Sequence, residues 1–300
     1  MKRKLCIAVL GPTASGKTGF AIAVAEKLGG EIVCVDSTTV YRGFDIGTAK
    51  PTTEQRQRVP HHLLDILDPQ EAFNARDFVD QARAKMEEIA SRGKIPVLVG
   101  GSYFYLRALQ NGMYPTGGYD ESVLDALEEE FPENLHEALV KEDPKAAQAI
   151  HPNDRYRLLR AMALVRSGQK PSELEPAQPM GKEWLWVKYA MAVSRKSLSD
   201  NIALRTKTMV RAGLVDETRS LLAQFPKART LGSIGYAESV LLLHKKLDES
   251  SLETAITENT RKLLKRQMTW LRSDPEVRFV DSRDLGRVEL EITNLQSVLA

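Results

Sequence analysis

The chain has 300 residues, of which 42% are hydrophobic and 27% are charged, and its formal net charge is only +2. This composition is that of a globular protein, and the balanced charge disfavours a protein that coats nucleic acid indiscriminately, although a local docking surface remains compatible with it. No apolar run approaches the roughly 18 residues of a membrane span. The basic N-terminus precedes an apolar run that is too short for a signal peptide, so we expect a cytoplasmic protein without membrane contact.

The first predicted strand, Lys4–Leu10, leads into GPTASGKT and then into an apolar-periodic helix that stops at Gly29–Gly30. Strand, glycine-rich turn and helix start form a P-loop, which binds phosphate through backbone N–H groups, a lysine and the helix dipole. The Thr18 hydroxyl is placed to hold Mg²⁺. The predicted phosphate-binding residues are Gly11, Pro12, Thr13, Ala14, Ser15, Gly16, Lys17 and Thr18. The motif alone does not decide whether the phosphate belongs to ATP.

Two more buried strands are predicted, at 31–35, which ends at Asp36, and at 94–101. The segment between them reads as a long helix with Asn74 as its N-cap and Gly93 as its stop. Strands that alternate with helices predict a doubly wound parallel sheet, and ligands gather at the carboxyl ends of such strands. We therefore expect the residues that follow the three strands to converge on one crevice.

Strand signals are absent from about 113 to 183, where short acidic helices and a proline-rich segment predict a helical insertion domain. The α/β core would then comprise 1–112 and 184–300. One helix of the insertion carries Arg157 and Arg160 on one face, which is either a solvated surface or a contact for nucleic acid.

After a strand at about 183–193, the remainder of the chain is predicted to be helical. One of these helices carries basic residues on a single flank near Trp270, and this flank is a candidate contact for nucleic acid or pyrophosphate. Its members are Arg261, Lys262, Lys265 and Arg266. Cys6 and Cys34 fall in predicted strands and are expected to be buried thiols.

Asp36 has two interpretations at this stage. An aspartate that ends a strand some twenty residues past a P-loop is typical of the Mg²⁺-binding strand of small-molecule kinases, with Arg157 and Arg160 as a lid over a γ-phosphate. The same carboxylate could instead act as a general base toward a nucleophile that attacks the carbon attached to a bound pyrophosphate. Pattern and spacing alone favour the kinase.

Longer motifs favour the second interpretation. VDSTTVYRGFDIGTAKP (35–51), VPHHLLDI, PVLVGGS, IHPNDRYRLLRA and KRQMTWLR together resemble the tRNA dimethylallyltransferase family in its short bacterial form, from about Leu5 to Arg272. The resemblance implies a P-loop, nucleotide-kinase-like core with a helical insertion. It also implies Mg²⁺-dependent transfer of a dimethylallyl group from dimethylallyl diphosphate to the exocyclic amino group of the adenosine 3′ to the anticodon in tRNA. The P-loop would then hold a prenyl diphosphate, and no ATP is used.

Site residues follow from the resemblance position by position. Asp36 would orient and deprotonate the adenine amine, Lys17 and the P-loop would neutralise the leaving diphosphate, and Ser102 would contact the reacting region. Contacts to tRNA and to its flipped adenosine are implied for Asp36, Ser37, Thr38, Thr39, Ser102, Tyr156, Arg157, Leu158, Leu159 and Arg160.

The chain departs from the family pattern at Ser102, where the family usually has threonine, and at Thr39, Gly232 and Ala237. The family often has glutamine where Thr39 stands, arginine or glutamine where Gly232 stands, and a basic residue where Ala237 stands. A phosphate or tRNA contact of the family is therefore missing in the 232–237 loop, unless Arg229 replaces it.

The alternatives that remain are a cytokinin-type enzyme that prenylates free adenine nucleotides, a P-loop kinase and a P-loop binding module. We expect a monomer.

Overall fold

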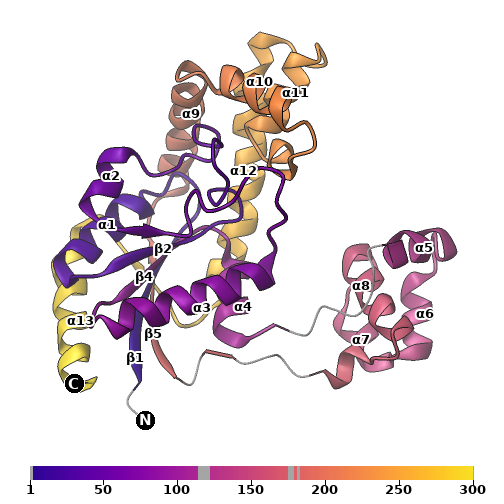
Figure 1. Ribbon diagram of the computed structural model, residues 1–300, viewed down its shortest axis with the longest axis horizontal. Coiled ribbons are helices and arrows are strands. Elements are labelled where there is room, and N and C mark those ends of the chain that lie inside the picture. Colours follow the sequence, from indigo (N-terminus) through magenta and orange to yellow (C-terminus); the bar gives the residue numbers. More distant parts are fainter. Residues whose placement is uncertain (1–2, 114–121, 175–178, 181–182, 300) are drawn as a thin grey trace. The chain divides into compact units, whose positions relative to one another are not determined.

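The computed structural model describes residues 3–113, 122–174, 179–180 and 183–299. At its centre is a six-stranded sheet in the order β3-β2-β4-β1-β5-β6 (Figure 1). All neighbouring strands are parallel. The strands are β1 (Lys4–Leu10), β2 (Glu31–Val35), β3 (His61–His62), β4 (Pro96–Gly100), β5 (Trp184–Met191) and β6 (Val277–Val280). The prediction of an α/β fold with a parallel sheet flanked by helices is confirmed.

The central strands are apolar along their length because both faces of the sheet are covered. Ile7 and Val9 of β1 belong to a core that includes residues of α1 (Lys17–Leu28) and α13 (Leu285–Leu299). Ala8 points to the opposite face and is equally buried. A continuous hydrophobic run therefore identifies these strands in the sequence.

Helix ends lie where capping residues were predicted. The Asn74 side chain accepts a hydrogen bond from the N–H of Asp77 at the start of α3 (Ala75–Ser91). The Asp77 side chain accepts one from the N–H of Asn74, and the two bonds form a capping box. Gly29 ends α1 with φ of 63°, a left-handed conformation that glycine adopts without steric cost.

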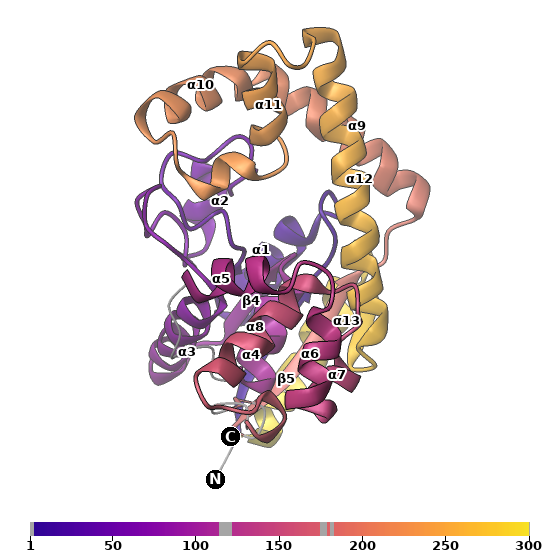
Figure 2. The ribbon, with the colours of Figure 1, turned by 90° about the vertical axis from the view of Figure 1, so that its right-hand side faces the viewer.

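The α/β core contains further helices in addition to α1, α3 and α13. Figure 2 shows the long helix α12 running beside α9, with α10 and α11 near one end of α12. These elements are α2 (Thr53–Arg58), α4 (Tyr103–Asn111), α9 (Arg195–Arg211), α10 (Leu214–Gln224), η2 (Arg229–Gly232), α11 (Tyr236–Leu243), α12 (Glu249–Ser273) and η3 (Ser282–Asp284).

The structure contains two edge strands, β3 and β6, that the sequence did not predict. The prediction that only helices follow the strand at 183–193 is wrong at β6, which pairs with β5 from Val277 to Val280. Only the two end residues of β6 are buried, so its sequence lacks the apolar run of the central strands. β3 is a two-residue strand formed by His61 and His62. Its polar residues carry no strand signal.

The chain divides into two compact units, one formed by 1–110 and 180–300 and the other by 111–179. The second unit is helical, and its hydrophobic core includes Leu127, Leu139 and Met162. Its elements are α5 (Ser122–Glu130), α6 (Leu135–Glu142), α7 (Pro144–Ala149), α8 (Arg155–Arg166) and η1 (Pro171–Glu173). None of the helices in the described part of either unit combines the length and apolarity needed to cross a membrane.

Candidate active site

Three neighbouring strands end level with one another. Leu10 of β1 and Val35 of β2 both pair with Gly100 of β4. A Cβ at Gly100 would lie 1.9 Å from the Val35 carbonyl oxygen, so only glycine fits between these strands. The residues that follow them, Gly11, Asp36 and Gly101, therefore emerge side by side at the carboxyl edge of the sheet.

The P-loop turns sharply from β1 into α1. Gly16 is the N-cap of α1 with φ of 81°, and no side chain caps the helix there. The first N–H groups of α1 thus have neither an intrahelical acceptor nor a capping side chain, which leaves them available to an anion. A Cβ at Gly11 would lie 2.6 Å from Ser15 Oγ, so a side chain there would force the Ser15 hydroxyl to move.

Positive charge gathers around the P-loop. Burial and the neighbouring Arg205 guanidinium lower the pKa of Lys17 to about 8, although Asp36 acts in the opposite direction. Burial also lowers the pKa of Arg205, which Asp36 partly offsets. Two cations that line one cavity and interact electrostatically indicate a place for an anion that would relieve their repulsion.

Asp36 is held by the turn that follows it. Its Oδ1 accepts hydrogen bonds from the N–H of Thr38 at 2.8 Å, from Thr38 Oγ1 at 2.6 Å and from the N–H of Thr39 at 3.3 Å. Within the described part of the chain, Oδ2 receives no hydrogen bond and is left for a ligand. Thr39 Oγ1 is buried without a partner among the described residues, so this turn offers a second unused polar atom.

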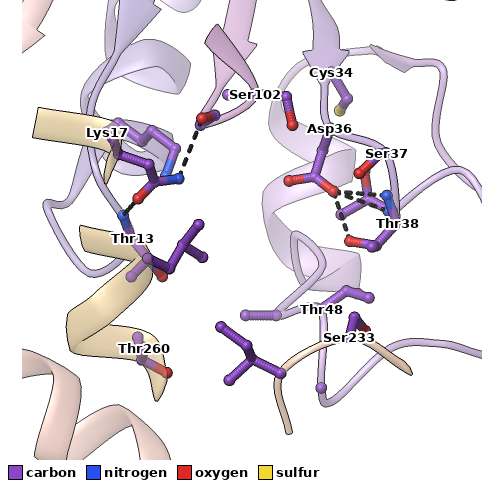
Figure 3. A pocket seen from close by; sticks show the side chains of 18 of the residues that line it. Thr13, Lys17, Cys34, Asp36, Ser37, Thr38, Thr48, Ser102, Ser233 and Thr260 are labelled. Carbon is purple, nitrogen blue, oxygen red and sulfur yellow. Dashed lines mark hydrogen bonds between the residues drawn. The ribbon is translucent and has the colours of Figure 1, made fainter. Parts of the chain in front are cut away.

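One cavity of about 610 Å³ contains these groups. Lys17, Asp36 and Ser102 all line it, as the topology of the strand ends predicted. In Figure 3, Lys17 and Thr13 lie on one side of the cavity and Asp36 and Thr38 on the other, with Ser102 between them. An anion bound at the P-loop would therefore face the Asp36 carboxylate across the cavity.

Two further residues of the cavity were not predicted as site residues, although one of them, Gln267, lies within the KRQMTWLR motif. Arg205 comes from α9, and Gln267 comes from α12. The Gln267 side chain accepts from the N–H of Thr13 at 3.0 Å and donates to the carbonyl of Gly101 at 3.2 Å, so it ties the P-loop to the end of β4. A single arginine or glutamine on a helix has no distinguishing spacing, and only the packing of α9 and α12 reveals its place.

Beyond Asp36 the wall is formed by the 44–50 loop, which α10 and α11 hold in place. The Glu217 carboxylate accepts from the N–H of Ile46 at 3.0 Å. The buried Tyr236 donates to Glu217 and contacts the N–H of Gly47 at 3.1 Å. Gly47, Thr48 and Ser233 all line the cavity, and Figure 3 shows the side chains of Thr48 and Ser233.

The predicted tRNA-binding helix, α8, lies in the second unit. Tyr156 and Arg157 are exposed on it, and Arg160 contacts the Tyr156 hydroxyl at 3.0 Å. Leu158 and Leu159 are 2% and 8% exposed and belong to the core of that unit. The side chains of these two leucines pack against α5 and α6, and the contact of this segment with tRNA stays a prediction.

The departures from the family pattern at Gly232 and Ala237 lie in η2 and α11. Gly232 is exposed at the cavity, whereas Arg229 is not among the described residues that line it. Burial raises the pKa of Tyr41 and of Tyr105, and the positive charge of Arg229 partly offsets this effect. Of the basic flank of α12, Arg266 lines the cavity.

Known proteins are similar to this chain in sequence and in fold. The model of the IPP transferase family matches residues 39–274. The chain belongs to this family. A tRNA dimethylallyltransferase of Koribacter versatilis is 41% identical over 289 residues, which are 93% of this chain and 94% of the relative. One of Geobacter metallireducens is 42% identical over 288 residues, with 93% of each chain covered.

Solved structures of IPP transferases extend the similarity to the fold. The tRNA isopentenylpyrophosphate transferase of Bacillus halodurans is 34% identical and superposes with a TM-score of 0.74 over 99% of this chain and 98% of its own. A eukaryotic dimethylallyltransferase that acts on tRNA is 28% identical, with a TM-score of 0.80 over 94% of this chain and 75% of its own. The P-loop, nucleotide-kinase-like core expected from the sequence is the core of an IPP transferase.

Proposed function

We propose that the protein transfers a dimethylallyl group from dimethylallyl diphosphate to the exocyclic amino group of the adenosine 3′ to the anticodon in tRNA and releases diphosphate. One observation carries this function: the P-loop and the Asp36 carboxylate face each other across a single cavity. The names of the relatives supply the reaction class. A tRNA substrate also agrees with the expected cytoplasmic location.

The geometry supports a direct displacement. The amine nitrogen of the flipped adenosine attacks C1 of the dimethylallyl group, the C1–O bond breaks, and its electron pair leaves with the diphosphate. Lys17, Arg205 and the N–H groups at the start of α1 neutralise the charge that grows on the diphosphate. Asp36 accepts the amine proton on the free Oδ2, while its Oδ1 stays bonded to the 38–39 turn.

Magnesium fits this site only together with the substrate. No cluster of three or more His, Cys, Asp or Glu side chains that could hold a metal occurs among the described residues. Thr18 lines the cavity at the start of α1, and Mg²⁺ commonly binds one or two protein groups together with phosphate oxygens and water. When bound through Thr18 and the diphosphate, Mg²⁺ would add positive charge to the leaving group.

Ser102 lies between the two halves of the cavity and would contact the reacting carbon region.

The test uses labelled dimethylallyl diphosphate, Mg²⁺ and unmodified tRNA, with and without ATP. We expect label in the tRNA and no effect of omitting ATP. A tRNA with guanosine in place of the target adenosine is the matched control, because guanine has no amino group at that ring position. Label that reaches only AMP would identify a cytokinin-type enzyme. ATP-dependent phosphorylation of a small molecule without prenyl transfer would refute the proposal.

Arg157 and Arg160 provide a prediction for the tRNA interface. We expect the double alanine variant to bind tRNA more weakly, and the salt slope of log K to fall by about 1 for each phosphate that these arginines neutralise in the wild type. Affinity is measured at several salt concentrations. Arg166→Ala is the control, because Arg166 lies on the same helix and pairs with Glu130 at the surface of the unit. An unchanged slope in the double variant would mark both arginines as ordinary surface residues.

A further inference from the structure

Phe104 is an exposed aromatic residue at the rim of the cavity. It belongs to α4, lines the cavity and is 57% exposed. A single exposed apolar residue is common on protein surfaces, but this ring lines the cavity of the proposed reaction, where a bound substrate would cover it. The reaction proposed above assigns it no role.

The side chains of Tyr103 and Tyr105, the residues before and after Phe104, are both held by contacts within the protein. Tyr103 is buried, donates its hydroxyl to the carboxylate of Asp274 and lies 6.0 Å from the Trp270 ring. Tyr105 stacks on Phe78 at 4.8 Å with 26° between the ring planes. Because both neighbours are anchored, the backbone of this turn is fixed and Phe104 is presented outward before any ligand binds. A pre-organised ring loses little conformational entropy on binding.

The rim around Phe104 carries positive charge. Arg266 is exposed and lines the same cavity, and the Arg107 guanidinium lies 5.7 Å from the centre of the Trp270 ring. Arg266 forms no ion pair with a carboxylate within the described ranges. An aromatic surface with neighbouring cations matches unpaired nucleotides, whose bases stack and whose phosphates are negative.

We propose that Phe104 is a stacking platform for the nucleobase adjacent to the one that enters the cavity, so that the partner of this rim is a single-stranded RNA loop. The inference rests on the proposed function. Removing one base from a stack exposes the face of its neighbour and costs free energy, and a ring at the rim covers that face again. Phe104 is a specificity residue for RNA and takes no part in the chemistry at C1.

The test measures RNA affinity and base stacking separately. Two anticodon stem–loops carry fluorescent 2-aminopurine in place of the base on the 5′ or the 3′ side of the target adenosine. We expect one of them to fluoresce less in complex with the wild type than in complex with Phe104→Ala, where the exposed base face stays uncovered, and we expect Phe104→Ala to raise the Kd about 5- to 150-fold. Phe104→Trp should restore the lower fluorescence and the affinity, and the KM for dimethylallyl diphosphate should stay unchanged in all variants.

Two controls separate stacking from other effects. Phe279→Ala removes another exposed phenylalanine, which is 43% exposed on β6 and outside the set that lines the cavity, and should behave as wild type. Phe104→Leu keeps an apolar side chain without a ring and should not restore the lower fluorescence. Equal Kd for wild type and Phe104→Ala, full rescue by leucine, or equal fluorescence in the wild-type and Phe104→Ala complexes with both RNAs would each overturn the inference. If wild type still prenylates the stem–loop, the proposed function survives that failure.

Discussion

Replacing Asp36 with asparagine is expected to lower turnover by roughly 10²–10⁴, the usual contribution of a general base. The amide oxygen can keep the bonds that Oδ1 accepts from Thr38 and Thr39, with the NH₂ group in the place of Oδ2. The turn therefore keeps its geometry, and only the capacity to accept the amine proton is lost. Dimethylallyl diphosphate and tRNA should still bind.

Turnover is measured in single-turnover assays with saturating tRNA, beside separate binding measurements for both substrates. Asp216→Asn is the control, since Asp216 is a surface aspartate of α10 outside the cavity lining. Unchanged turnover in the Asp36 variant would exclude a general-base role. Loss of Mg²⁺-dependent nucleotide binding would instead return the assignment to a kinase.

Lys17→Met is the second substitution with a large expected effect. Methionine keeps the apolar stem of the side chain but removes the cation that faces the leaving diphosphate. Loss of one pre-organised group that stabilises developing charge typically lowers the rate by roughly 10²–10³, and we expect kcat to fall by this amount. Lys207→Met, an exposed lysine of α9 that does not line the cavity, should leave kcat unchanged.

The pH dependence of pyrophosphate binding tests the same lysine independently. The pKa of Lys17 is lowered to about 8 in the free protein, so the cation is present below that pH and is lost as pH rises through it. A bound anion favours the charged form, and binding above pH 8 must therefore take up a proton. Between pH 7 and pH 9 the affinity advantage of wild type over Lys17→Met should shrink about tenfold. Titration of pyrophosphate itself cancels in this ratio, and a ratio independent of pH would contradict the prediction.

Local sequence was sufficient for the core of the fold. The strand before the P-loop and the strand before Asp36 are buried on both faces, so their apolar runs are unambiguous. The parallel topology follows from the alternation of strands and helices, and it places Lys17, Asp36 and Ser102 at one edge before any coordinates are known. The two middle residues of the edge strand β6 are exposed, so its sequence has no continuous apolar run from which a strand could be predicted.

The direction in which helical side chains point was harder to infer. The motif around Tyr156 resembled a binding segment as a whole, yet only part of it faces outward. Leu158 and Leu159 pack into the core of the second unit, while Arg157 remains exposed. A motif identifies a stretch of chain, whereas burial decides which of its side chains can meet a partner.

By itself, the sequence determined the P-loop, the aspartate that follows the second strand and the family, because these depend on short segments whose residues are neighbours in the chain. Only the tertiary structure placed Arg205 in the same cavity as Lys17, Gln267 between the P-loop and β4, and Phe104 outward at the rim. Each of these positions depends on how α4, α9 and α12 pack against the ends of the strands. Contacts between segments that are distant in the sequence arise from packing, and no local pattern of residues encodes them.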